Sequence, residues 1–161
     1  MSTYPTSPGH PTPPGHPTLP GHPTLPELVE GGHIGEVVAA ASFLFTRDNL
    51  VRYAGASGDF NPIHFRDDVA QSVGLPGVLA HGMLTMGVAV QPIVDWAGDP
   101  GRIIDYQVRF TRPVPVDAAD GAVVDVVATV GAVEDGVARI DLTVTFAEKT
   151  VLGKAQVRVT L

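Results

Sequence analysis

Two residues five positions apart, Asp59 and His64, have side chains able to move protons between groups. A carboxylate and an imidazole can share such work, because imidazole titrates near neutral pH. On a helix, at about 100° per residue, these side chains would point about 140° apart. Asn61-Pro62 lies between them and favours a turn over a helix, since proline disfavours the α conformation of the residue before it. A turn can bring both side chains to one cavity.

The spacing of this pair leaves two interpretations open. One is an acid/base pair, with Gly55 and Gly58 upstream permitting a tight backbone path. The other is an aspartate that caps a helix and a histidine that packs in the core. The spacing alone does not separate them.

A second polar pair, His81-Gly82, begins a long apolar segment. The N-terminus of a helix presents unpaired N–H groups and a partial positive charge. Gly82 has no side chain, so a ligand carbonyl can approach its N–H, as in an oxyanion site. The alternative is that Gly82 only lets the helix begin close to a sheet. His81 is interpreted as a structural cap without a chemical role.

The first half of the domain supplies the helices that must position these groups. Thr46 is a predicted N-cap of a helix over residues 47–55, after a short strand at 41–45. A second short helix is predicted over residues 67–73. Residues 82–98 are apolar on nearly every side, which is typical of a buried helix, and we expect it to be kinked or ended near Pro92.

The second half changes to a period of two, which is typical of strands. Strands are predicted over residues 102–112, 122–130, 137–146 and 150–161, with Gly153 expected on the buried side of the last. Glu134-Asp135-Gly136 predicts a tight turn. Successive strands with short connections imply an antiparallel sheet. The fold class is therefore α+β, a curved sheet around a central helix.

Composition excludes several classes of function. The 161 residues contain no cysteine, so disulfides, thiolate metal sites and a cysteine nucleophile are excluded. The formal net charge is -7 without a basic cluster, which argues against nucleic acid as a partner. The apolar run at 82–98 falls short of the roughly 20 residues that span a bilayer, and no signal peptide is recognised. We expect a cytoplasmic protein.

Residues 1–27 are rich in Pro, Gly and His and predict a disordered tail, with one folded domain over residues 28–161. A Pro-Gly-His-Pro-Thr unit recurs in this tail. Its histidines, His10, His16 and His22, could chelate a metal, but the ion would have to order a flexible segment. We therefore expect a tail without metal.

Two linked motifs carry a resemblance to a known family. They comprise Gly58, Asp59, Asn61, Pro62, Ile63, His64 and Ala70, then His81, Gly82 and Met83. This pattern resembles the MaoC-like, R-specific enoyl-CoA hydratase family (hydratase 2) over roughly residues 28–161. The run from residue 51 to about 116 is most similar to the catalytic B subunit of (3R)-hydroxyacyl-ACP dehydratases.

The resemblance implies a hot-dog fold that interconverts (3R)-3-hydroxyacyl and trans-2-enoyl thioesters of CoA or acyl carrier protein. It implies Asp59 and His64 as acid/base residues, Asn61 and Pro62 as their support, and the Gly82 amide as carbonyl anchor. Which of the first two handles which proton stays open. No metal or other cofactor is expected. A homodimer or a heterodimer with a second hot-dog subunit is expected. The alternatives are a hot-dog acyl-thioesterase and a non-catalytic acyl-binding subunit.

Overall fold

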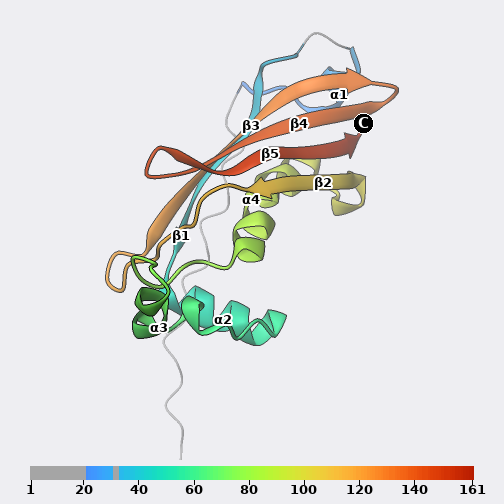
Figure 1. Ribbon diagram of the computed structural model, residues 1–161. Helices are drawn as coiled ribbons and strands as arrows, with labels where there is room; N and C mark the ends of the chain where they lie inside the picture. Colours follow the sequence, from blue (N-terminus) through green and yellow to red (C-terminus); the bar gives the residue numbers. More distant parts are fainter. Residues whose placement is uncertain (1–20, 31–32) are drawn as a thin grey trace, which may run out of the picture.

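The computed structural model describes residues 21–30 and 33–161 (Figure 1). Its helices are α1 (Leu25–Glu30), α2 (Arg47–Ser57), α3 (Asp67–Ser72) and α4 (Gly82–Ala97), with short 3-10 helices η1 (Pro62–His64) and η2 (Pro100–Arg102). Its strands are β1 (Val37–Phe45), β2 (Ile103–Phe110), β3 (Ala122–Glu134), β4 (Val137–Phe146) and β5 (Lys149–Thr160). Each predicted helix and strand is therefore present, with shifted ends.

The strands of the described chain form a single antiparallel sheet in the order β1-β3-β4-β5-β2. β3 and β4 are joined by the predicted turn, in which Asp135 and Gly136 have φ of 50° and 73°. Positive φ at both central residues matches the right-handed twist of the flanking strands. The sheet curves, and α4 lies against one of its faces (Figure 1). The predicted α+β architecture is confirmed.

The core lies between α4 and the sheet. Ala89, Ile93 and Ala97 of α4 are buried against alternate residues of the strands, among them Val126 and Ile140. Valine suits these positions because β-branched side chains pack well on a pleated surface. Among the described residues, no helix is long and apolar enough to cross a bilayer.

Of the two outcomes expected at Pro92, a kink or an end of the helix, the end is wrong, because α4 continues to Ala97. Proline removes a single N–H donor from the helix. The turn that follows Pro92 is held by burial of Ile93 and Ala97, which are 0% and 6% exposed. Tertiary packing therefore outweighs the local preference of proline.

The alternation predicted for the last strand is also interrupted. Val151 and Leu152 are both buried, and Lys154 has a φ of 48°. The pairing of β5 with both neighbours shifts register here, which identifies a β-bulge. Ala155 resumes the alternation on the buried side.

The described part of the chain includes residues before the predicted domain boundary at residue 28. Residues 1–20, with His10 and His16, lie outside the described residues. Of the predicted tail, His22 contacts the carbonyl of Val37 through Nδ1, and the Pro23 carbonyl accepts a hydrogen bond of 2.9 Å from the Trp96 indole. These partners lie 15 and 73 positions away, so the composition of the segment did not reveal them.

Candidate active site

Helix α2 ends just before Asp59, the first predicted site residue. Thr46 accepts a hydrogen bond from the backbone N–H of Asn49, and the Asn49 side chain accepts one from the backbone N–H of Thr46. This capping box confirms Thr46 as the N-cap. The helix ends at Gly58, whose φ of 75° is a left-handed conformation that glycine adopts without strain. Asp59 follows directly.

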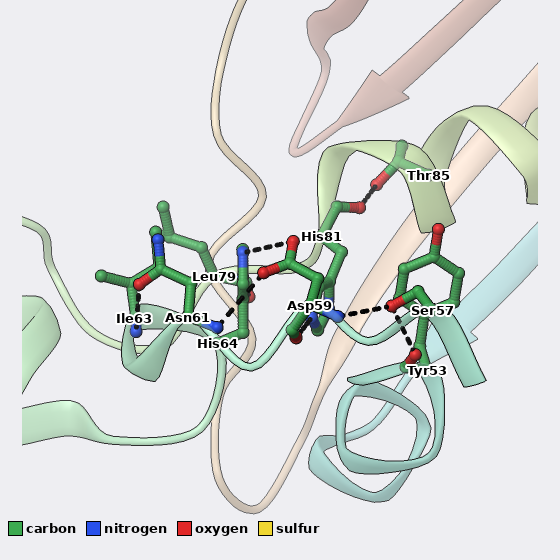
Figure 2. Close-up of polar contacts among 9 residues, drawn as sticks. All are labelled: Tyr53, Ser57, Asp59, Asn61, Ile63, His64, Leu79, His81 and Thr85. Carbon is green, nitrogen blue, oxygen red and sulfur yellow. Dashed lines mark hydrogen bonds and ion pairs between the residues drawn. The ribbon is translucent and has the colours of Figure 1, made fainter. Parts of the chain in front are cut away.

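Asp59 is held by short-range hydrogen bonds on both sides (Figure 2). Its backbone N–H donates to the Ser57 hydroxyl at 3.2 Å, and its Oδ1 accepts from the backbone N–H of Asn61 at 3.2 Å. The second oxygen, Oδ2, lies 3.9 Å from Nε2 of His64. The side chain is 51% exposed, so this carboxylate is open to a ligand from solvent.

The Asn61-Pro62 turn brings His64 to the same place. The Asn61 side chain accepts a hydrogen bond from the backbone N–H of Ile63 and so begins η1. The Ile63 carbonyl accepts from the backbone N–H of Leu79, which joins the turn to the segment before α4. Asn61 and Pro62 therefore shape the turn that carries the imidazole, as a local Asx turn followed by proline would.

His64 is largely buried, and its tautomer follows from its partner. Its Nδ1 lies 2.8 Å from the Leu79 carbonyl oxygen, which can only accept a hydrogen bond. Nδ1 therefore carries the proton in the neutral ring, and Nε2 carries a lone pair that faces Asp59. The 3.9 Å between Nε2 and Oδ2 exceeds a hydrogen-bond distance, so both atoms can contact one small group between them.

Gly82 is the first residue of α4, where the N–H has no acceptor within the helix. It borders a cavity of about 320 Å³ whose walls include Ala80, Thr85, Phe110, Val151 and Leu152. A Cβ atom at Gly82 would lie 3.1 Å from the Phe110 ring. The absence of a side chain therefore leaves room at this N–H, next to a largely apolar cavity.

His81 occupies the N-cap position of α4, as predicted, but its side chain makes no capping hydrogen bond and lies in the candidate site instead, which sequence reasoning did not foresee. It is 1% exposed, its ring stacks on His64 with centroids 3.8 Å apart and 22° between the planes, and the Tyr53 ring meets it edge-on at 4.9 Å. Its Nε2 lies 3.2 Å from the backbone oxygen of Asp59. Burial lowers the pKa of His81 below 6.5, and the nearby His64 adds to this, while the Asp59 carbonyl and carboxylate oppose it. Its position beside Gly82, within the motif His81, Gly82 and Met83, was the signal in the sequence.

The side chains of Asp59, His64 and His81 gather ligand atoms within 4.8 Å of one another, a spacing that invites comparison with a metal site. The two imidazoles are stacked, however, so their nitrogen lone pairs lie in nearly parallel planes. Lone pairs in parallel planes do not converge on one ion, whereas tetrahedral or octahedral coordination requires convergence. The geometry favours proton transfer over metal binding.

Comparison with known proteins gives consistent matches. The MaoC like domain family matches residues 30–151. 3-hydroxyacyl-thioester dehydratase X of Mycobacterium tuberculosis is 39% identical over 82 residues, covering 51% of this chain and 28% of that protein. Peroxisomal enoyl-CoA hydratase 2 of Arabidopsis thaliana is 35% identical over 60 residues, covering 36% of this chain and 19% of that protein. The chain thus spans less than a third of the length of either curated relative.

Solved structures show the same fold. A MaoC-like dehydratase matches with a TM-score of 0.79 and 33% identity, over 88% of this chain and 43% of that one. A chain of the ChsH1-ChsH2 complex from Mycobacterium tuberculosis matches with a TM-score of 0.68 and 22% identity, over 80% of this chain and 97% of that one. These likenesses confirm the hot-dog fold.

Proposed function

Because this chain belongs to the MaoC-like domain family, we propose that it interconverts (3R)-3-hydroxyacyl and trans-2-enoyl thioesters by reversible loss of water. The observation that carries the proposal is the pair Asp59 and His64. Their Oδ2 and Nε2 atoms face each other at 3.9 Å, one open to solvent and the other holding a lone pair. Relatives named as a 3-hydroxyacyl-thioester dehydratase and an enoyl-CoA hydratase support it.

Dehydration requires two proton transfers at one site, one from C2 and one to the β-hydroxyl. The C2–H bond next to the thioester carbonyl breaks, its electron pair forms the C2=C3 bond, and the C3–O bond breaks. The β-hydroxyl takes up a proton and leaves as water. Asp59 and His64 together handle the proton that leaves C2 and the one that the hydroxyl gains. Hydration is the same path reversed.

The thioester carbonyl gains negative charge as the C2 proton leaves. The Gly82 N–H, at the positive end of α4, is our proposed donor to that oxygen. The cavity beside Gly82, lined in part by Val151 and Leu152, suits an acyl chain. The substrate would be carried by CoA or acyl carrier protein, without a metal or redox cofactor. We further propose the cytoplasm as the compartment, where both carriers are available.

The test is hydration of crotonyl-CoA by the purified chain, followed by loss of the enoyl absorbance. Asp59→Asn keeps an oxygen that can accept from the Asn61 N–H but loses the basic carboxylate, and His64→Gln loses the titratable ring. Each should lower kcat by about 10²–10⁴-fold with the fold intact. Asp48→Asn, at an exposed position of α2, is the matched control.

The competing functions give different results in the same assay. A thioesterase would release free CoA thiol without hydrating the double bond, and a non-catalytic acyl-binding subunit would do neither. Wild-type turnover retained by Asp59→Asn or His64→Gln would refute the roles given to these residues.

We also propose that the chain works as a dimer, and we favour a heterodimer with a second hot-dog subunit over a homodimer of two copies of this chain. Strand β2 is an edge of the sheet, and Ile104 and Phe110 on it are 49% and 51% exposed. An open edge with apolar side chains favours pairing. The structural likeness to a chain from the two-component ChsH1-ChsH2 complex supports this. Light scattering that finds a monomer fully active on long acyl chains would contradict it.

A further inference from the structure

Two contacts connect His81 to the two proposed acid/base residues (Figure 2). Its ring stacks on the His64 ring at 3.8 Å, and its Nε2 lies 3.2 Å from the Asp59 backbone oxygen. Its own carbonyl accepts hydrogen bonds from the Thr85 N–H at 3.1 Å and the Thr85 hydroxyl at 3.2 Å. His81 is therefore bonded to the first turn of α4 on one side and to the Asp59 turn on the other.

The protonation state of His81 follows from these partners. The Asp59 carbonyl only accepts, so Nε2 of His81 carries the proton and donates it. Nδ1 is buried and, among the described residues, meets no hydrogen-bond partner. A proton on Nδ1 would make a buried cation against the His64 ring, and the carboxylate near it in the described part of the chain is that of Asp59. The groups that face this ring are thus Asp59, His64 and Tyr53, and the neutral Nε2–H form fits them.

The hydrogen bond to Asp59 differs in range from the other bonds of that residue. Those to Ser57 and Asn61 join positions two apart and shape the turn only locally. The bond from His81 crosses 22 positions and connects the turn to the residue before Gly82. Leu79 also ties the turn to this segment through Ile63 and His64, but the bond from His81 is made to the Asp59 backbone itself.

We propose that His81 is a positioning residue, whose Nε2–H holds the Asp59 turn against the start of α4 so that carboxylate, imidazole and amide keep one geometry. The inference rests on the proposed function, because it assigns a task within that reaction. His81 itself transfers no proton, since its single N–H is committed to the Asp59 carbonyl.

Two substitutions of His81 separate the contribution of its hydrogen bond from that of its stacked ring. His81→Gln places an amide N–H near the position of Nε2 and loses the ring, whereas His81→Phe keeps a stacked ring and loses the donor. For crotonyl-CoA hydration we expect His81→Phe to lower kcat roughly 10–100-fold with KM nearly unchanged, since it displaces a reacting group rather than a binding group. His81→Gln should recover most of that loss. His33→Phe, at a histidine paired with Glu36 outside the site, should leave kcat unchanged.

The inference is overturned if His81→Phe turns over like the wild type, or if a folded His81→Gln is as slow as His81→Phe. An inactive wild type would overturn the proposed function instead, which keeps the two failures distinct. Nitrogen NMR of the histidine rings in the wild-type protein needs no variant to fold and no activity. It should show His81 protonated at Nε2 and bare at Nδ1 at neutral pH, and a protonated Nδ1 would refute the assignment.

Discussion

Replacing Gly82 with proline isolates the contribution of one backbone N–H. Proline has no N–H, yet it is favoured at the first position of a helix, which Gly82 occupies. The residue before proline should be extended, and His81 has φ of -62° and ψ of 131°. Gly82→Pro should therefore fold while removing the proposed donor to the thioester oxygen.

The matched control is Gly82→Ala, which keeps the N–H. Both variants add a Cβ that would lie 3.1 Å from the Phe110 ring, so that ring must shift by a few tenths of an ångström in each. Phe110 is 51% exposed and can yield at its free end. The Cβ contact is thus common to both variants, and the difference between them reports on replacing the N–H donor by the Cδ of the proline ring.

Loss of one oxyanion donor costs about 10²–10³-fold in kcat, or about 2.7–4 kcal/mol of transition-state stabilisation. We expect that ratio between Gly82→Ala and Gly82→Pro in crotonyl-CoA hydration, with thermal unfolding checking the fold of each. Equal turnover of the two folded variants would refute the role of the Gly82 amide.

Two further predictions concern stability. Leu28→Ala should lower the unfolding free energy by about 2–5 kcal/mol, and Tm by at least about 4 °C, because Leu28 is fully buried. The control is Val29→Ala, at a neighbouring residue that is 65% exposed, and it should change Tm little. Deletion of residues 1–20 should also change Tm little. A Leu28→Ala variant as stable as Val29→Ala would show that α1 does not pack against the core. Burial raises the pKa of Tyr106 from 10.0 to about 12, so the neutral phenol is favoured in the folded state. The stability that the neutral phenol contributes is complete below pH 10.0 and is lost as the pH rises towards 12. Tyr106→Phe should therefore flatten the curve of Tm against pH between these two values. A curve that the substitution leaves unchanged would contradict this prediction.

Features set by neighbours in sequence were predictable. The Thr46 cap, the Asp135-Gly136 turn and the Asn61-Pro62 turn depend on contacts within a few residues, so the local sequence specifies them. Strand periodicity likewise predicted the antiparallel sheet, because alternate burial leaves a period of two. The same local turn brings Asp59 and His64 to within 3.9 Å.

Features that depend on distant partners were decided by the tertiary structure. α4 continues through Pro92 because Ile93 and Ala97 pack in the core. The Pro23 carbonyl accepts a hydrogen bond from the Trp96 indole, 73 positions away. The stacking of His81 on His64 depends on how the turn meets α4, a contact between segments 17 positions apart with no periodic signature. Sequence thus identified Asp59 and His64 as candidates for proton transfer, and only the packing of helix, turn and sheet placed His81 against both of them.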